Sequence, residues 1–309
     1  MVTVLLCPGQ GAQKVGMGRD LAERFPAARD TFDAIDDALG VPLSRLMWDG
    51  PEDELTLTHN AQPAILAHTC AVLSVVGSRL GTVVAAAGHS LGEYSAYVAA
   101  GSLTPTDGAR IVRRRGELML EAGKARAGAM AAIIGLGSAE VAAACDGAST
   151  SNEVAVPANL NAPDQTVISG DPAAVTRAGE ACKAAGAKRV LPLKVSGAFH
   201  SPLMAPAVPG LAAALEAAPF SAPRFPVVAN ATALPIRDVA RARHLLAEQV
   251  VSPVRWVECM QTCAADHPRA RFLEVGPGSV LSGLLKRIVP GTAGITLGTA
   301  DEVEKFLAA

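Results

Sequence analysis

The chain has 309 residues, of which 50% are hydrophobic and 18% are charged, and its formal net charge at pH 7 is -2. That much apolar sequence can bury a substantial core in at most about two domains. A net charge so near zero argues against general binding to nucleic acid or to a membrane surface. No run approaches the ~18 apolar residues of a membrane span, and the chain does not begin with the basic segment of a signal peptide. The six scattered cysteines indicate reduced thiols and a cytoplasmic protein.

Residues 1–8 are apolar and predict a first strand, which is followed by the turn Pro8-Gly9-Gln10-Gly11. A phosphate-binding loop is excluded, because both its Lys-Ser/Thr ending and the G-x-G-x-x-G spacing are missing. If this strand lies beside the strand that leads to Ser90, the Gln10 backbone N–H could stabilise a developing oxyanion. A plain strand-to-helix turn with Gln10 in water explains the pattern equally well.

A G-x-S-x-G pentapeptide, residues 88–92, directly follows the apolar run Val83–Ala87. The run predicts a buried strand, and Leu91–Ala100 predicts a helix that Gly101 stops. A serine at such a strand-to-helix turn is typical of a nucleophile elbow, which exposes the hydroxyl of Ser90 to substrate. The N-terminus of the helix, including the Leu91 N–H, favours negative charge at this point.

Arg115 interrupts the apolar face of the next predicted helix. Thr104 and Pro105 have the composition of a helix start, and Val112, Arg115 and Met119 then fall on one face at helical spacing. A cation on a buried face is costly unless an anion pairs with it. An internal salt bridge would satisfy Arg115, and so would the carboxylate of a substrate held bidentately.

The stretch of residues 127–195 has its own pattern. Strands are predicted at 129–135, 154–158, 166–169 and 189–195, and helices at 138–145 and 172–185. The order β-α-β-β-α-β is that of a split βαβ, ferredoxin-like unit. We therefore predict a small domain, residues 127–195, inserted into a larger α/β domain of residues 1–126 and 196–309 with a parallel sheet. In the larger domain, helices are predicted at 209–218 and 240–250 and a strand at 271–275.

A serine nucleophile needs a base, and His200 is the best placed of the six histidines. It lies in a small-residue loop after the strand that ends near Val195, where open α/β sheets place their sites. A structural role explains its position equally well. His89 leaves the elbow in another direction from Ser90, and the other four histidines fit solvent or core positions. Cys259 and Cys263 are one helical turn apart but lack the companion motif of a metal site.

Several segments together, in this order, resemble the malonyl-CoA:acyl-carrier-protein transacylases, which are discrete acyltransferases of fatty-acid or polyketide synthesis. The resemblance covers nearly the whole chain. The segments are residues 8–11, Thr58 to Pro63, 88–93, Arg115-Gly116, Asn159 to Asn161, 197–201, 253–256 and 274–278.

The resemblance implies the fold, an α/β protein with a hydrolase-like parallel-sheet core and the inserted ferredoxin-like domain. It implies that malonyl-CoA acylates Ser90 and that the acyl group then passes to the phosphopantetheine thiol of acyl carrier protein, without a metal or redox cofactor. His200 is then the base, Gln10 and Leu91 are the oxyanion donors, and the backbone carbonyl of Gln249 orients the histidine in a Ser–His dyad. The substrate-binding positions that it implies are Arg115 for the malonyl carboxylate, Met119, Phe199, Gln62 and Asn159.

Two other functions remain open. A serine esterase or thioesterase shares the elbow, but its usual chain order needs an acid between Ser90 and His200, and Asp164 and Asp171 both fall in the inserted domain. A non-catalytic subunit that docks carrier proteins would need none of the catalytic residues. Lys286 and Arg287 are candidates for a local basic patch that binds an acidic carrier, or for a solvated helix end. Nothing indicates an obligate interface, so we expect a monomer.

Overall fold

The computed structural model describes residues 2–309 as a mixed α/β protein with two sheets. The larger sheet has the order β10-β9-β1-β2-β7-β8, and the smaller one has the order β4-β5-β3-β6. The strands are β1 Val2–Cys7, β2 Thr82–Gly88, β3 Ala129–Ile134, β4 Ala155–Ala162, β5 Gln165–Gly170, β6 Arg189–Pro192, β7 Val227–Val228, β8 Pro235–Ile236, β9 Arg271–Val275 and β10 Gly294–Leu297.

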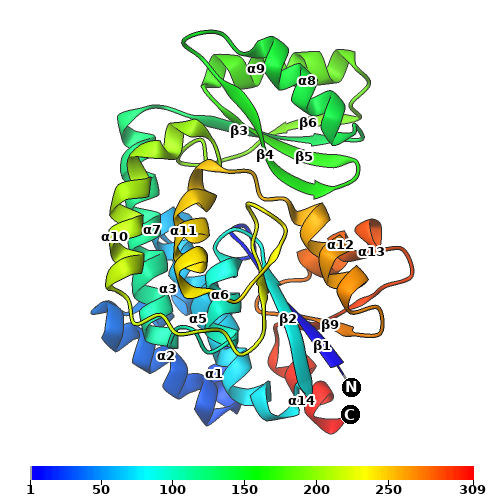
Figure 1. Cartoon of the computed structure of the whole chain (residues 1–309). Helices are drawn as coiled ribbons and strands as arrows, with labels where there is room; N and C mark the ends of the chain where they lie inside the picture. Colours follow the sequence, from blue (N-terminus) through cyan, green and yellow to red (C-terminus); the bar gives the residue numbers. More distant parts are fainter. Residues whose placement is uncertain (1) are drawn as a thin grey trace.

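Helices cover both sheets (Figure 1). The α-helices are α1 Arg19–Arg24, α2 Pro26–Leu39, α3 Leu43–Asp49, α4 Glu52–Thr56, α5 Thr58–Val76, α6 Gly92–Ala99, α7 Pro105–Ala125, α8 Ser138–Ala148, α9 Pro172–Ala184, α10 Val208–Ala217, α11 Val239–Glu248, α12 Trp256–Asp266, α13 Val280–Ile288 and α14 Ala300–Ala308. Three short 3-10 helices are η1 Gly77–Arg79, η2 Pro202–Ala207 and η3 Gln249–Val251.

Strands β1 and β2 lie side by side and parallel, with Cys7 opposite Gly88. The first strand thus lies beside the strand that leads to Ser90, which is the condition stated above for an oxyanion role of the Gln10 N–H. Strands β9, β10 and β7 continue the sheet in parallel, and within residues 2–309 only β8 joins it antiparallel. Because parallel strands end at the same edge, the loops after β1 and β2 meet there.

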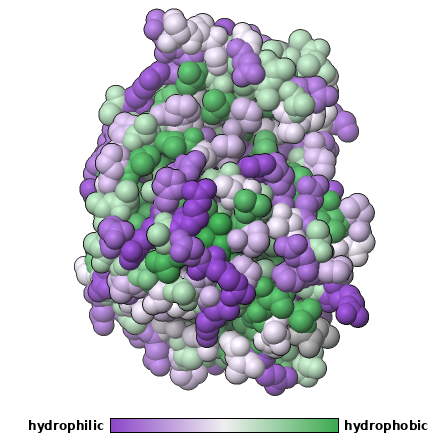
Figure 2. Space-filling model, viewed as in Figure 1, coloured by the Kyte–Doolittle hydropathy of each residue, from purple (hydrophilic) through white to green (hydrophobic). Residues whose placement is uncertain are grey.

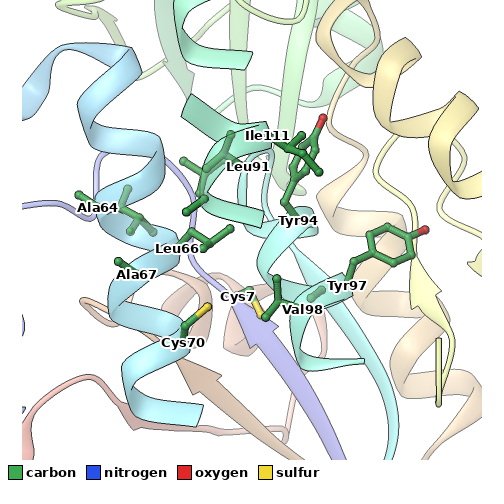
Figure 3. Close-up of a cluster of buried hydrophobic side chains, with 14 of the residues drawn as sticks. Cys7, Ala64, Leu66, Ala67, Cys70, Leu91, Tyr94, Tyr97, Val98 and Ile111 are labelled. Carbon is green, nitrogen blue, oxygen red and sulfur yellow. The ribbon is translucent and has the colours of Figure 1, made fainter. Parts of the chain in front are cut away.

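Alternate residues of β1 enter two different cores, as the two-residue period of a strand requires. Leu5 and Cys7 pack into the core that contains α5, α6 and α7, whereas Val4 and Leu6 pack into the core that contains α12 and α13. Figure 3 shows the first core, where Cys7 lies among side chains of α5 and α6. The sheet is therefore buried on both faces, as expected for parallel strands.

Helix α5 corrects one expectation. It is long and apolar enough to cross a membrane by length and composition, with a mean hydropathy of 1.3, although no such segment was expected. Polar side chains such as Gln62 and His68 interrupt the apolar sequence, but the mean hydropathy of the segment stays as high as that of a membrane span. In the fold, 72% of this window is buried, and Ala64, Leu66 and Cys70 pack in the core that Figure 3 shows. Helix α5 is thus a core helix in this structure.

The smaller sheet and its helices follow the predicted order β-α-β-β-α-β, and all of its strand pairs are antiparallel. They form a separate layer at the top of Figure 1, and both chain termini lie at the opposite end. On the face in Figure 2, hydrophilic residues are interspersed with smaller apolar areas.

Two strand ends of the smaller sheet differ from the prediction. Strand β4 continues to Ala162, because residues 159–162 pair antiparallel with residues 165–167 of β5. Leu160 N–H also donates to Val254 O (2.9 Å), and Val254 N–H donates to Ala158 O (2.8 Å). The register of the pairing with β5 shifts between Pro157 and Asn159 and again between Leu160 and Ala162, so the alternation that marks a strand is lost there. Strand β6 ends at Pro192 instead of continuing to residue 195, because residues 193–195 leave the sheet and line the cavity described below.

Candidate active site

Ser90 lies in a tight turn between β2 and α6, with a backbone φ of 53°. L-residues rarely adopt this conformation, so its presence in a non-glycine residue is a functional hint. Both flanking glycines are required by close approach. A Cβ on Gly88 would lie 1.9 Å from the backbone of Gly92, and one on Gly92 would lie 2.2 Å from the carbonyl oxygen of Cys7.

The turn rests on buried contacts. The Ser90 N–H donates to Asn230 Oδ1 (2.7 Å), and Asn230 Nδ2 donates to Gly88 O (2.8 Å). Leu91 and Tyr94 are fully buried, and the Tyr94 hydroxyl donates to Leu246 O (3.2 Å). In Figure 3, Leu91 and Tyr94 lie within the packed core. The hydroxyl of Ser90 is therefore held by a rigid support, which a reactive group requires.

Ser90 and His200 are in contact, with 2.8 Å between Ser90 Oγ and His200 Nε2. The other ring nitrogen, Nδ1, lies 2.9 Å from Gln249 O and 3.2 Å from Ser252 O. Carbonyl oxygens only accept, so Nδ1 carries the proton and Nε2 accepts from the serine hydroxyl. Burial, and secondarily the charge of Arg115, lower the pKa of His200 to about 3. The imidazole is therefore neutral at pH 7 and free to accept a proton.

His200 has no carboxylate partner within residues 2–309. Asp171 pairs with Arg126 (2.8 Å), and Asp164 pairs with Arg287. These two acids, which were considered for the acid position of an esterase, are thus occupied elsewhere. The site is a Ser–His pair whose histidine is oriented by two backbone carbonyls.

Arg115 is 1% exposed, and its guanidinium reaches Ser90. Nη2 donates to Ser90 Oγ (3.1 Å) and to Gln249 Oε1 (3.0 Å), and Nη1 donates to Gln62 Oε1 (2.7 Å). Nε has no hydrogen-bond partner, and no carboxylate of the described chain, residues 2–309, is ion-paired with this guanidinium. The internal salt bridge that was one explanation of Arg115 is therefore not present. A buried cation with a spare donor beside the nucleophile suits an anionic substrate group.

The polar wall continues from Arg115 along α5 to the turn after β1. Gln62 Nε2 donates to Thr58 Oγ1 (3.0 Å), and the Thr58 hydroxyl donates to Gln10 Oε1 (3.1 Å). The Gln10 side chain is half-buried and hydrogen-bonded to Thr58 at the edge of the site. Gln62 Nε2 also lies 3.5 Å from Met119 Sδ. These contacts fix the turn that carries the Gln10 amide.

A cavity of about 320 Å³ opens onto Ser90 and His200. Met119, Phe199 and Asn159, three of the five predicted substrate-binding residues, line it. Leu193, Lys194 and Val195 close it from the side of the smaller sheet. An adjacent hollow of about 230 Å³ shares Gln10, Gly11 and His89 with it and extends to α13. A larger hollow of about 530 Å³, lined partly by Leu73, Val83 and Arg224, contains none of these residues.

His89 does not face the nucleophile. Its Nε2 lies 2.8 Å from Asn161 Oδ1, and its ring packs against Trp256 with the centroids 5.5 Å apart. A structural role was predicted, and these contacts are structural.

Sequence reasoning assigned no role to Asn230 or Glu93. Asn230 follows the short buried strand β7 at the edge of the sheet where Ser90 lies, and a polar residue at the carboxyl end of a parallel strand could have identified it. Glu93 is fully buried in the first turn of α6. Its carboxylate accepts from the Asn230 N–H (2.9 Å) and from Gln249 Nε2 (2.7 Å).

The chain matches the acyl transferase domain family over residues 4–296. It is 44% identical over 299 residues to a malonyl CoA-acyl carrier protein transacylase of Bacillus subtilis, which covers 97% of this chain and 94% of that protein. The chain belongs to this family. Its identity to the transacylase of Salmonella typhimurium is 46% over 283 residues, or 91% of each chain.

Solved structures of transacylases agree with this membership. A crystal structure of an acyl carrier protein S-malonyltransferase from Vibrio cholerae superposes with a TM-score of 0.93, at 42% identity, over 98% of this chain and 99% of that one. A malonyl-transacylase in complex with its type II PKS acyl-carrier protein has a TM-score of 0.94, also at 42% identity, over 100% of this chain and 99% of that chain.

Proposed function

We propose that this protein transfers a malonyl group from malonyl-CoA to the phosphopantetheine thiol of acyl carrier protein through a malonyl-Ser90 intermediate. The observation that carries the proposal is the buried guanidinium of Arg115, which lies 3.1 Å from Ser90 Oγ. An acyl group on that oxygen places its far carboxylate beside the guanidinium, where a charge-assisted bidentate contact can form. The relatives that carry the transacylase name support the same activity.

The reaction uses the contacts that already exist. Ser90 Oγ attacks the thioester carbonyl while His200 Nε2 accepts the hydroxyl proton, and the backbone amides of Gln10 and Leu91 receive the oxyanion. The proton then passes to the leaving sulfur of CoA. In the second half, His200 takes the proton of the phosphopantetheine thiol, and the thiolate attacks the ester carbonyl of malonyl-Ser90. The bond to Ser90 Oγ then breaks, and His200 returns the proton to that oxygen. Both halves are acyl and proton transfers, so we propose that no metal or redox cofactor takes part.

The remaining cavity residues shape the acyl site. Gln62 holds one edge of the Arg115 guanidinium, and Gln249 holds the other while its own carbonyl orients His200. Met119 and Phe199 supply apolar walls, and Asn159 supplies a polar one. We assign Gln62, Met119, Phe199 and Asn159 to substrate binding together with Arg115, and Gln249 to the catalytic group.

We further propose a division into two domains, a hydrolase-like core of residues 1–126 and 196–309 and an inserted ferredoxin-like domain of residues 127–195. The β-α-β-β-α-β order and the antiparallel sheet β4-β5-β3-β6 support the insertion. The six cysteines are all free, which supports a cytoplasmic location. Ser90, His200 and Arg115 come together within one chain, which supports activity as a monomer.

Replacement of Arg115 by Ala separates a malonyl transferase from a general serine acyl enzyme. A charge-assisted hydrogen bond contributes about 1.5–3 kcal/mol, so kcat/KM for malonyl-CoA should fall on the order of ten- to a hundred-fold. Acetyl-CoA has no carboxylate and should be unharmed or improved. The measurement is the ratio of the two kcat/KM values, because unfolding would lower both alike.

Arg114→Ala is the matched control. Arg114 lies on the same helix but is exposed and pairs with Glu117, so this variant should keep the parent's ratio. If malonyl and acetyl transfer fall by the same factor in Arg115→Ala, the guanidinium is structural.

Carrier recognition gives a separate prediction on α13. Both candidate cations are exposed, but Arg287 pairs with Asp164 and donates to Gln165 Oε1 (2.6 Å), whereas Lys286 makes no ion pair within residues 2–309. Lys286 is therefore the simpler of the two candidates to test. Helix α13 borders the hollow next to the active site through Val280 and Leu284. Lys286→Glu should slow transfer to an acidic carrier and leave acylation by malonyl-CoA unchanged.

The matched control is Lys305→Glu, an exposed cation on α14. Transfer rates would be measured at several salt concentrations, because a rim charge changes the salt dependence of association. If the Lys286 and Lys305 variants show equal carrier kinetics, Lys286 is only a solvated helix end.

A further inference from the structure

Glu93 is a buried carboxylate next to the reaction centre without an ion pair. It is 1% exposed, and Oε2 accepts from the Asn230 N–H (2.9 Å) and from Gln249 Nε2 (2.7 Å). Oε1 is buried with no hydrogen-bond partner. Within the described chain, residues 2–309, no lysine, arginine or histidine makes a salt bridge to it. Such a charge is expensive to bury, so a second charge elsewhere in the site must compensate it.

The compensating charge is Arg115, and the carboxamide of Gln249 lies between the two. Gln249 Nε2 donates to Glu93 Oε2, and also to Ser90 O (3.0 Å), while Gln249 Oε1 accepts from Arg115 Nη2 (3.0 Å). An ionised carboxylate only accepts, so it selects the NH₂ end of the amide and turns the carbonyl end toward the guanidinium. Glu93 therefore acts on Arg115 through one side chain and does not itself touch the cavity that holds substrate.

Glu93 is the member of this cluster that titrates near neutral pH. Burial raises its pKa to about 7, against the opposing effects of the hydrogen bonds from Asn230 and Gln249 and of the Arg115 charge. The groups that face it from the packed elements stay in one form. Burial raises the pKa values of Tyr94 and Tyr97 on α6 and of Cys259 on α12, His200 is neutral, and Arg115 is charged.

We propose that Glu93 is the counter-charge of Arg115 in the empty site and takes up a proton when a malonyl carboxylate occupies Arg115. This rests on the proposed function. With Arg115 and Glu93 both ionised, the empty site is close to neutral, and a second carboxylate would leave it negative in a buried setting. A like charge favours the protonated carboxyl, so a proton moves from water to Glu93. Glu93 is thus a positioning residue that adjusts the charge of the malonyl site.

The proton balance distinguishes malonyl from acetyl. In both acylations the hydroxyl proton of Ser90 passes through His200 to the sulfur of CoA, so Ser90 and CoA exchange a proton without net uptake. Malonylation takes one further proton from solvent onto Glu93, and acetylation takes none. Any ionisation of the released CoA thiol is common to both substrates and cancels in the difference.

The test measures proton uptake with a pH indicator in weak buffer when the enzyme is acylated by malonyl-CoA or by acetyl-CoA. At about pH 7.5, the malonyl reaction should take up about half a proton more per acylated enzyme, because Glu93 is mostly ionised there beforehand. Glu93→Gln should abolish the difference. Tyr97→Phe, which alters another buried and unpartnered polar atom on α6, should keep it.

A second readout is the pH dependence of selectivity. Between about pH 6.5 and about pH 8.5, the parent's ratio of kcat/KM for malonyl-CoA over acetyl-CoA should fall about sixfold, as expected for a pKa increase of about one unit. The ratio should be flat in Glu93→Gln. Malonylation without extra uptake, or uptake that persists in Glu93→Gln, overturns the role of Glu93 alone. Failure of malonyl-CoA to acylate Ser90 at all would instead refute the proposed function.

Discussion

Ser90→Ala should form no acyl-enzyme with malonyl-CoA and should transfer nothing to the carrier. No other side chain can take its place, because His200 Nε2 and Arg115 Nη2 both point at this one oxygen. The fold should survive, since Ala keeps the Cβ and the φ of 53°, and the two lost hydrogen bonds, one of them from the Arg115 guanidinium, together contribute only about 2–4 kcal/mol. Mass measurement of the protein after mixing with malonyl-CoA reads the result directly.

Ser95→Ala is the matched control for this variant. Ser95 lies on the same helix, α6, and its hydroxyl is buried with no hydrogen-bond partner. Its loss should leave the added malonyl mass and the transfer rate as in the parent. Undiminished labelling of Ser90→Ala would show that the acyl group resides on another residue.

The turn at Ser90 could be predicted because its causes are local. A small-residue strand, a glycine on each side of the serine and a helix after it lie within about twenty consecutive residues, and periodicity reads such segments well. The same holds for Thr104, whose hydroxyl accepts from Asp107 N–H (3.1 Å) at the predicted helix start. The order of elements in the smaller sheet could be predicted for the same reason, because each of its strands and helices shows as a short segment with its own local pattern.

The network beneath Ser90 could not be predicted, because it joins residues far apart in the chain. Asn230 contacts Ser90 across 140 positions, and Gln249 contacts Glu93 across 156. No local pattern specifies such a pair, and a buried glutamate in a helical first turn reads as an ordinary solvated residue. Arg115 shows most clearly which features of the site the sequence could predict and which it could not. Its burial followed from helical spacing, but the absence of an internal carboxylate partner required the structure.

His200→Ala should slow acylation of Ser90 by about 10²–10⁴-fold, the usual loss when a general base is removed. Without the imidazole, the hydroxyl must lose its proton to water in a cavity where Gln10 and Leu91 still stabilise the oxyanion, so a residual rate should remain. Single-turnover acylation by malonyl-CoA at neutral pH measures this step alone. His244→Ala is the control, because that ring is exposed and lies beside Glu248 at 3.4 Å.

The pH dependence of the parent enzyme tests the same assignment. Because burial and Arg115 lower the pKa of His200 to about 3, its base form should persist, and acylation should not fall with a midpoint near pH 6.5. The free energy of unfolding, unlike the acylation rate, should decrease in acid. Below about pH 6.5 the unfolded chain gains a proton that buried His200 does not, so acid lowers the free energy of unfolding through the window from about 6.5 down to about 3. An acylation rate that halves near pH 6.5 while the protein stays folded, or His200→Ala acylating at the parent's rate, would show that the base is a different group.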